Sequence, residues 1–561
     1  MTSIATLLPG MTRLRHYERP WLRGDVLAGV TVAAYLVPQC MAYAELAGVS
    51  PVAGLWAVVP ALCVYALVGS SPQLSAGPES TTAVMTAAAV APLAAADPSG
   101  YAALAAMLAI MVGGVCLVAR LFRLGFLADL LSRPILVGYM AGVAVIMVIS
   151  QLGKLTGVSV DGDDALAELR SFLSQIDEVH GATVLLAALV LAFLFAVQHW
   201  FPRLPGPLLA VLLSTAAVAL FDLQARGIAV VGDIPAGFPT PGLPGVDAGD
   251  LASLVGPALG IALVGYSDNV LTARAFAARG GYEVDANQEL LALGAANAGS
   301  GLLQGFPVSS SGSRTVLGDA MGSRSQLHSL VAAASVVLVL LFLRPVLAEF
   351  PSAALGAIVV YAAVRLVDVA GFRRLLAFRP TEFALALATT LGVLVFDILY
   401  GVLVAVALSV LELLSRVARP PSAVLGRVPG MAGLHDVSDW EGATTVPGLV
   451  IFRYDAPMFF ANAEHLRSRV LEVLDAQPEP VDWLVLNVEA TVEVDITAAD
   501  TLAELADELD RRGVRLGLAR MKQDLRDQLA PTGLLERIGP DMVFPTLPTA
   551  LEAFAHRDGG S

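Results

Sequence analysis

Stretches of about twenty apolar residues recur through most of the chain, and they constrain its fold more than any other feature. Hydrophobic residues make up 56% of the 561 and charged residues only 15%, whereas a soluble protein carries about 25% charged residues. A helix needs about 20 apolar residues to cross the hydrocarbon core of a bilayer. The pattern therefore predicts an α-helical protein that crosses a membrane many times.

The apolar segments form two sets of seven, separated by a Pro- and Gly-rich loop at Phe238–Pro244. The first set covers residues 25–44, 51–68, 78–95, 101–119, 134–152, 181–199 and 206–222. The second set covers residues 251–272, 288–304, 310–322, 327–343, 351–367, 381–397 and 400–418. Seven segments in each set would make the two halves inverted relative to one another, as in many secondary transporters.

Arginines indicate how these segments are oriented. Four of them precede the first segment, at Arg13, Arg15, Arg19 and Arg23, and such clusters mark the cytoplasmic side. We therefore expect a multi-pass plasma-membrane protein with both termini in the cytoplasm. The predicted parts are an N-terminal segment (1–24), a transmembrane domain (25–420), a linker (421–445) and a cytoplasmic domain (446–556).

Two of the segments open with polar, helix-breaking residues at matching positions, each third in its set. One opening runs from Gln73 to Thr82 and the other from Gly305 to Arg314. Lipid-facing backbone could not be interrupted in this way, because its polar groups would lack partners. We interpret them as half-helices that meet at the bilayer midplane and direct their N-termini at an anion. The alternative is that each is an ordinary re-entrant or interhelical turn.

Arg314 lies one turn into the second half-helix and offers a fork of N–H donors suited to oxyanions. Its alternative role is that of a snorkelling or ion-paired structural residue. Gln39 and Tyr43 lie four residues apart beside Pro38 in the first span, so they share a helical face. We expect that face to line the site, although hydrogen bonds between helices would also explain these two residues.

Carboxylates inside membrane spans are costly and mark functional sites. Asp268 and Thr272 again lie four residues apart, in the eighth segment. They could coordinate Na⁺, or Asp268 could bind a proton; a structural pairing of Asp268 with Arg274 or Arg314 is the alternative. A carboxylate beside an anion disfavours its binding unless it is neutralised, so a coupling cation is expected. Glu79 is a second candidate acid, or else a residue that only interacts with a helix dipole.

The chain after about residue 446 changes character and becomes acidic. It holds 11 Lys and Arg against 20 Asp and Glu, which argues against nucleic-acid binding. Strand-like runs at 449–454, 483–488 and 514–519 alternate with helical stretches at 463–475 and 498–512. This alternation predicts a small α/β binding or regulatory module.

No pattern in the sequence indicates an enzyme or a bound cofactor. The chain shows no defensible Ser/His/Asp or Cys/His arrangement and no Gly-rich phosphate loop in its C-terminal part. Cys40, Cys63 and Cys116 all lie in apolar runs without metal-ligand or disulfide spacing. The only non-substrate ligand that we expect is the coupling ion, H⁺ or Na⁺.

Several motifs together resemble the SulP family of anion transporters over nearly the whole chain, and in particular its actinobacterial sulfate-transporter members. They are Pro38–Ala44 with Gly54-Leu55-Trp56, Ser75–Pro78, Phe306-Pro307 through Ser313-Arg314, and, similar to the STAS domain of that family, Ala456–Ala463 and Val494–Ala498. The resemblance implies fourteen segments as a seven-plus-seven inverted repeat, divided into a core and a gate domain. It further implies an elevator-like motion, a homodimer and a small inorganic anion as substrate.

The resemblance also implies roles for individual residues. Gln39 and Tyr43 would line the site, with backbone N–H groups near Ser80 and Thr81. From the other side the anion would be bound by Ser311, Gly312, Ser313 and Arg314. An arginine at the position of Arg314 resembles sulfate-carrying members of the family. Asp268 and Thr272 instead resemble the Na⁺-binding pair of bicarbonate carriers. Glu79 departs from the small or apolar residue expected there. Thr497 matches a phosphorylated position of STAS relatives, although plain helix capping by Asp495 or Thr497 also accounts for it.

Four further hypotheses stand beside H⁺- or Na⁺-coupled sulfate uptake. Bicarbonate uptake with Na⁺ keeps the fold and changes the substrate. An anion exchanger or channel without cation coupling would make Asp268 structural. A nucleobase carrier of related fold is a third alternative, but Arg314 and the acidic C-terminal domain argue against it. A membrane-anchored signalling protein, with a STAS-binding partner as its output, leaves the charges within the spans unexplained.

Overall fold

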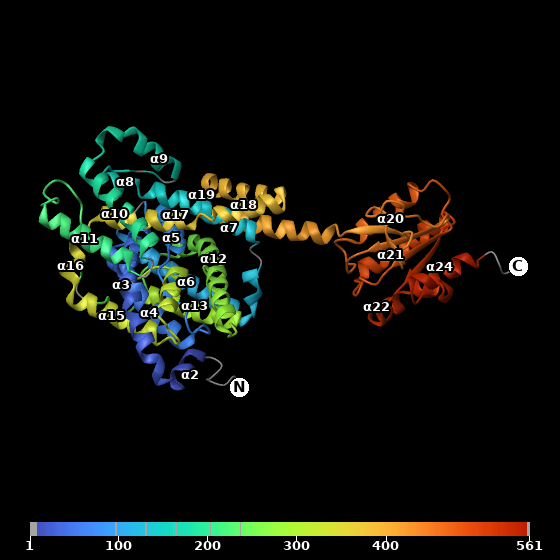
Figure 1. Cartoon of the computed structure of the whole chain (residues 1–561), viewed down its shortest axis with the longest axis horizontal. Helices are drawn as coiled ribbons and strands as arrows, with labels where there is room; N and C mark the ends of the chain where they lie inside the picture. The colour runs from blue at the N-terminus through green and yellow to red at the C-terminus, as the bar shows by residue number, and fades with distance from the viewer. Residues whose placement is uncertain are drawn as a thin grey trace. The chain divides into compact units, whose positions relative to one another are not determined.

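The computed structural model describes residues 8–557, apart from 96–97, 130–131, 161, 163–164, 202–203 and 236. The side chains of residues 127–129, 279, 397–403 and 405–406 also lie outside the description. The chain divides into two compact units, Met1–Ser409 and Val410–Ser561, which are blue to yellow-orange and orange to red in Figure 1.

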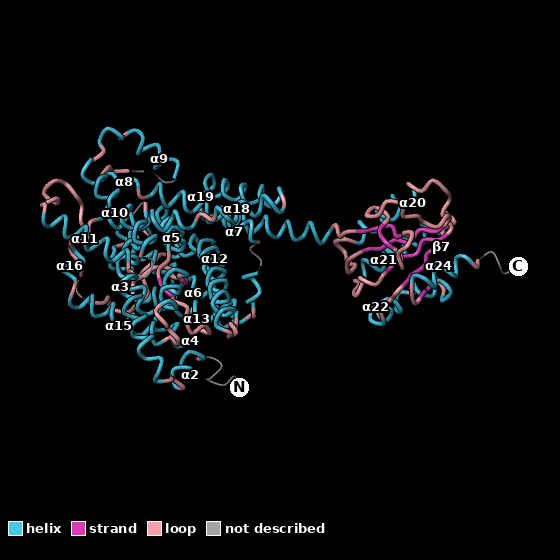
Figure 2. The backbone as a smooth tube through the Cα atoms, in the orientation of Figure 1, coloured by secondary structure: helices cyan, strands magenta, loops and turns pink. Residues whose placement is uncertain are grey.

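The first unit is almost entirely helical (Figure 2). Its helices are α2 (Pro9–Arg15), α3 (Leu22–Leu46), α4 (Pro51–Val68), α5 (Ser80–Ala94), α6 (Tyr101–Leu121), α7 (Arg133–Ser150), α8 (Leu152–Thr156), α9 (Ala165–Ser174), α10 (Gly181–Trp200), α11 (Gly206–Leu220), α12 (Ala248–Gly280), α13 (Ala286–Leu302), α14 (Gly312–Ala320), α15 (Leu327–Phe342), α16 (Arg344–Ala348), α17 (Ser352–Leu366), α18 (Val369–Phe378) and α19 (Pro380–Ala418), the last of which continues into the second unit.

A helix is found at each of the first twelve predicted segments, with ends within a few residues of those expected, except that α12 continues to Gly280. The break predicted between residues 397 and 400 is wrong, because α19 is one helical element from Pro380 to Ala418. No proline lies between the two predicted segments to remove a helical hydrogen bond. In the described part of the chain, seven helices are long and apolar enough to cross a membrane and four apolar helices are shorter. The number of fourteen spans stays a prediction.

The two predicted half-helices meet, as the sequence indicated. Each is preceded by a two-residue strand, β1 (Ala76–Gly77) before α5 and β2 (Ser309–Ser310) before α14. The two strands pair in antiparallel orientation, with Ala76 opposite Ser310 and Gly77 opposite Ser309. Two segments more than two hundred residues apart in sequence therefore form one element at the centre of the unit.

Close helix packing surrounds this element, and apolar side chains cover the outside. Helix α13 packs on α4 and α6, while α3 packs on α4 and α15. Leu185 and Leu189 on α10 are 61% and 60% exposed, as expected for a surface that faces lipid rather than water. At the contact of α3 with α4, a Cβ on Gly54 would collide with the backbone carbonyl of Cys40, so only glycine allows this approach.

The second unit contains a six-stranded sheet in the order β4-β3-β5-β6-β7-β8. Its strands are β3 (Ser422–Gly426), β4 (His435–Asp436), β5 (Leu449–Tyr454), β6 (Trp483–Asn487), β7 (Arg515–Ala519) and β8 (Val543–Phe544). Strands β5 to β8 are parallel, whereas β3 is antiparallel to both β4 and β5. The helices are α20 (Ala463–Asp475), α21 (Ile496–Arg511), α22 (Gln523–Leu529), α23 (Leu534–Ile538) and α24 (Leu547–Ala555).

The predicted α/β pattern of this unit is confirmed, but its start lies earlier than expected. Strands β5, β6 and β7 and helices α20 and α21 fall on the predicted runs. Residues 421–445, predicted as a linker, supply β3 and β4, and β3 pairs along most of its length with β5. Alternation with helices identifies only the parallel strands, which is why these two short antiparallel strands were not predicted.

Replacing Gly54 by Ala should destabilise the helical unit, since backbone atoms of α3 would have to move away. Overpacking of this kind costs about 1–3 kcal/mol, and we expect the melting temperature of the purified protein in detergent to fall by several degrees. Gly114→Ala in α6 is the matched control, because nothing lies within 4 Å of the added Cβ. Equal melting temperatures for the two variants would contradict the close α3–α4 contact.

Candidate anion-binding site

A cavity of about 350 Å³ lies where the half-helices begin. Its walls come from α3, α5, α7, α11, α12, α14 and α17. Nine residues predicted for the site line it: Gln39, Tyr43, Glu79, Ser80, Thr81, Asp268, Thr272, Gly312 and Ser313. The structure thus brings together side chains from the first and second halves of the sequence. Ser311 and Arg314, also predicted for the site, do not line the cavity and lie behind its wall.

The N-termini of α5 and α14 both open on this cavity. Ser80 and Thr81 begin α5, and Gly312 and Ser313 begin α14. Neither helix has a side-chain cap within the described structure, so N–H groups of both first turns remain available. Two positive helix ends directed at one space favour a negatively charged occupant.

Arg314 connects the strand pair to helix α3. Its side chain is completely buried, and Nη1 donates to the carbonyl of Pro78 at 2.8 Å and to Oε1 of Gln39 at 3.2 Å. Nε and Nη2 have no hydrogen-bond partner among the described residues. Gly77, with φ of 153°, passes close beside this guanidinium, because a Cβ there would lie 3.3 Å from Nη2. A side chain at residue 77 would crowd Arg314.

Gln39 transmits the position of Arg314 to the cavity wall. Its Oε1 accepts from Arg314, which turns Nε2 toward Tyr43, and Nε2 donates to the Tyr43 hydroxyl at 3.0 Å. Both Gln39 and Tyr43 line the cavity. In this conformation Arg314 therefore acts on the cavity through Gln39, and direct contact between Arg314 and an anion stays a prediction.

Two acidic side chains share the cavity wall. Oε1 of Glu79 accepts from the Ser80 hydroxyl at 3.0 Å, while Oε2 has no partner within the described structure. Asp268 faces Glu79 and Ser310, and within the described structure it forms no ion pair with Arg314. Thr272 lies one turn further along α12 and also lines the cavity. Carboxylate and hydroxyl oxygens at these positions could hold a proton or a hard cation such as Na⁺.

A second carboxylate cluster fixes α12 beside the cavity. Glu289 on α13 is completely buried and accepts hydrogen bonds from Tyr65 at 2.9 Å, from Asn269 at 2.6 Å, and from the Ser70 backbone and hydroxyl at 2.9 and 2.7 Å. Asn269 directly follows Asp268 in the sequence. Its bond to Glu289 therefore sets the rotation of α12 that presents Asp268 to the cavity.

Comparison with known proteins identifies the family. Residues 22–389 match the sulfate permease family, and residues 442–550 match the STAS domain. The chain is 58% identical to a probable sulfate transporter of Mycobacterium tuberculosis over 557 residues, 99% of each chain. The chain belongs to the sulfate permease family. It is therefore an anion transporter of the membrane and not an enzyme.

More distant members of the sulfate permease family and solved structures agree with this fold. Probable sulfate transporter 4.2 of Arabidopsis thaliana is 32% identical, over 99% of this chain and 84% of the plant protein. The murine anion transporter Slc26a9, solved in the inward-facing state, superposes with a TM-score of 0.89 at 24% identity, covering 98% of this chain and 94% of its own. The transmembrane domain of the cyanobacterial bicarbonate transporter BicA covers 70% of this chain and 98% of its own, with a TM-score of 0.62 and 26% identity.

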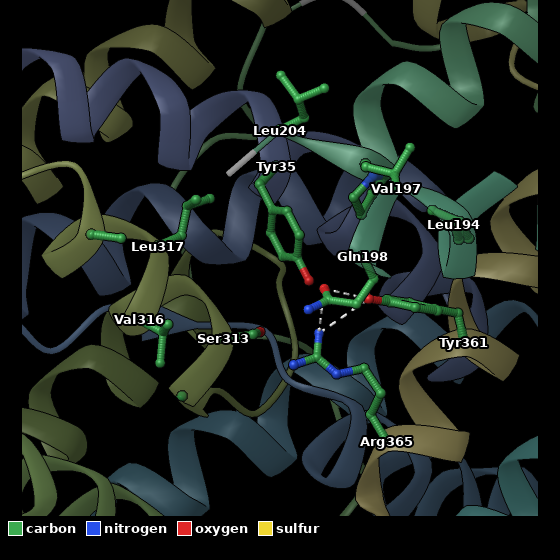
Figure 3. A pocket seen from close by; sticks show the side chains of 14 residues that line it. Tyr35, Leu194, Val197, Gln198, Leu204, Ser313, Val316, Leu317, Tyr361 and Arg365 are labelled. Atoms are coloured by element: carbon green, nitrogen blue, oxygen red, sulfur yellow. Dashed lines mark hydrogen bonds between the residues drawn. The ribbon is translucent and has the colours of Figure 1, made fainter. Parts of the chain in front are cut away.

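Sequence reasoning missed several polar side chains contributed by α3, α10 and α17. Tyr361, Arg365 and Tyr35 line the cavity of this permease together with the predicted residues. The Tyr361 hydroxyl donates to Oε1 of Gln198 at 2.9 Å, and Arg365 reaches both (Figure 3). The available signal was the four-residue spacing of Tyr361 and Arg365 within a predicted span. An arginine in the last turn of a span is, however, usually a residue that extends to the membrane surface.

Thr497 lies in the second unit at the beginning of α21. Its side chain is exposed, while Asp495 caps the helix by accepting from the Ala498 N–H at 2.8 Å. Asp495 also accepts from the N–H of Phe460 at 2.8 Å. Capping is therefore provided by Asp495, which leaves the Thr497 hydroxyl accessible to a modifying enzyme.

Replacing Glu289 by Gln should destabilise the permease. Both carboxylate oxygens of Glu289 accept hydrogen bonds, so the NH₂ of the glutamine amide would face hydrogen-bond donors in place of one of these oxygens. An unpaired buried polar group costs about 1–3 kcal/mol, so we expect a clear fall in melting temperature in detergent. Glu283→Gln, at an exposed position nearby, should melt like the wild type. If the Glu289 and Glu283 variants melted alike, the buried cluster would not hold α12 as described.

Phosphorylation at Thr497 can be tested directly by mass spectrometry of the protein from its native cells. We expect a phosphate there because a helix N-terminus stabilises the added negative charge. Samples from sulfur-replete and sulfur-starved growth should differ in occupancy. An unmodified Thr497 under both conditions would restrict this residue to a structural role.

Proposed function

We propose that the protein is a secondary active transporter that takes up sulfate across the plasma membrane, coupled to H⁺ or to Na⁺. The observation that carries the proposal is the cavity at which two uncapped helix N-termini and two carboxylates converge. The anion would be bound by N–H groups and hydroxyls of Ser80, Thr81, Gly312 and Ser313. Gln39 and Tyr43 would hold it from the α3 side. Sulfate is supported by the bacterial and plant relatives described as sulfate transporters.

Electrostatics supports cation coupling. A carboxylate about 4 Å from an anion raises its energy by about 4 kcal/mol at an effective dielectric constant of 20. Asp268 and Glu79 both line the cavity, and Glu79 lies within electrostatic range of Arg314. Arg314 behind the wall and Arg365 on it supply two positive charges against these two acids and a dianion. Binding of H⁺ or Na⁺ at Asp268, with Thr272 and Glu79 nearby, would remove part of this repulsion, and anion and cation would then travel together.

An elevator-type alternating access mechanism suits this arrangement. The half-helices, which the β1–β2 pair joins, form one wall of the cavity, and α17 contributes another. Movement of the first wall along the second would expose the same residues to either side in turn.

We further propose cytoplasmic termini and a homodimer, with the STAS domain available to a cytoplasmic partner. Small inorganic anions, the lipid bilayer and this partner complete the set of proposed interactions.

Na⁺-dependent bicarbonate uptake is the second candidate. Asp268 and Thr272 both contribute oxygen atoms to the cavity wall, as a Na⁺ site would require. The helical unit also has the fold of the BicA transmembrane domain. An uncoupled anion exchanger or channel is the third candidate and would need Asp268 only for structure.

Replacing Asp268 by Asn should strongly lower gradient-driven accumulation of labelled sulfate in proteoliposomes. The asparagine cannot take up a proton and binds Na⁺ more weakly, so we expect a loss of about 5- to 150-fold, the range of typical coupling energies. Uptake is measured under an inward proton gradient and an inward Na⁺ gradient in turn. Exchange of sulfate for sulfate without a gradient should persist.

Asp250→Asn is the matched control, because Asp250 lies in the first turn of the same helix and outside the cavity. Its uptake should equal that of the wild type. Bicarbonate uptake that requires Na⁺, with no sulfate uptake, would overturn sulfate in favour of the second candidate. Unchanged accumulation by the Asp268 variant would favour the uncoupled exchanger.

A further inference from the structure

A second cavity of about 300 Å³ adjoins the candidate site, and the two share a wall formed by Tyr35, Pro207, Gly312, Ser313, Tyr361 and Arg365. Figure 3 shows the Arg365 side chain extending from α17 into the space between Tyr361 and Ser313. The second cavity is thus continuous with the wall that holds the N-terminus of α14. A small anion leaving Ser313 would reach Arg365 next.

Arg365 is held in place and still has free donors. Its Nη1 donates to the Tyr361 hydroxyl at 3.2 Å and to Oε1 of Gln198 at 3.4 Å, and its Cζ lies 5.6 Å from the centre of the Tyr361 ring. Nε and Nη2 have no hydrogen-bond partner among the described residues. These two N–H groups form the edge with which a guanidinium binds two oxygens of one oxyanion.

The charges of the two cavities differ in sign. Among the described residues that line the second cavity, Arg365 is the one that carries a charge. The first cavity has the carboxylates of Glu79 and Asp268 in addition to Arg365. An anion that becomes repelled once the coupling cation leaves Asp268 would therefore find a favourable position beside Arg365.

The ends of the helices that form the second cavity indicate which side it faces. Gln198 lies at the C-terminal end of α10, Ala320 ends α14 and Arg365 is near the end of α17, whereas Gly206 begins α11. With the N-terminus in the cytoplasm, as the arginines of the first 24 residues predict, all four ends point to the cytoplasm. The second cavity then lies between the site and the cell interior.

We propose that Arg365, positioned by Tyr361 and Gln198, forms a second oxyanion-binding site on the cytoplasmic side of the transport site. The inference rests on the proposed function for the identity of the anion and for its direction of movement. The second site receives the anion as it leaves Ser313 and binds anions that enter from the cytoplasm. Cytoplasmic sulfate at Arg365 then slows further uptake by repelling the next anion, which gives the transporter sensitivity to the internal sulfate level.

The test measures sulfate transport separately from each face, using right-side-out and inside-out membrane vesicles from cells without their own sulfate uptake. Arg365→Gln should raise the half-saturating sulfate concentration about tenfold in inside-out vesicles, because focusing by a fixed charge raises local anion concentration by at least that factor. In right-side-out vesicles the same variant should raise it less, because external sulfate reaches Ser80 and Ser313 in the transport cavity before it reaches Arg365. Arg365→Lys should restore most of the inside-out affinity.

The matched control is Arg374→Gln on α18, an exposed arginine that lines neither cavity and should leave both values unchanged. An equal change on both faces, or no change on either, would overturn the second site, since loss of packing around Tyr361 has no reason to act on one face alone. A wild type that moves no sulfate overturns the proposed substrate instead. The same measurement is then repeated with labelled bicarbonate in place of sulfate. A larger effect of Arg365→Gln in inside-out than in right-side-out vesicles supports the second site, and an equal effect overturns it.

Discussion

The pairing of β1 with β2 is the contact on which the helical unit depends. Two helices that stop in the middle of an apolar layer leave N–H and C=O groups that lipid cannot satisfy. Here each interrupted segment supplies hydrogen-bond partners for part of the other segment's backbone, because Ala76 pairs with Ser310 and Gly77 with Ser309. The Ser311 N–H extends the pairing by donating to the carbonyl of Ser75 at 3.0 Å. Arg314 then ties the pair to α3 through Gln39.

Much of the fold followed from the sequence because membrane helices carry strong signals. A span must be long and apolar, and an interruption must be polar and contain glycine or proline, so both were visible without the structure. The short strands β3 and β4 were not visible in the sequence, because strands of two to five residues are too short to show a distinctive hydrophobic periodicity. The continuity of α19 was missed for a related reason, because a fall in hydropathy near Asp397 resembles a loop.

The candidate site divides in the same way. Nine residues chosen from the sequence line one cavity, because charges and hydroxyls in spans are expensive and therefore informative. The sequence did not indicate which of the predicted residues face the cavity and which lie behind its wall. The chemistry of Arg314 suggested contact with the anion, but only tertiary packing decides whether a side chain reaches a cavity or turns toward Pro78 and Gln39. Arg365 was overlooked because its position resembles that of an ordinary membrane-surface arginine.

The seam between β1 and β2 has a consequence for the synthesis of the protein. Gly77 is made more than two hundred residues before its partner Ser309, so the first half enters the membrane with an unpaired strand edge. The anion-binding wall exists only after the second half-helix, α14, has been inserted. A chain that stops early, or whose second half fails to insert, lacks this wall altogether.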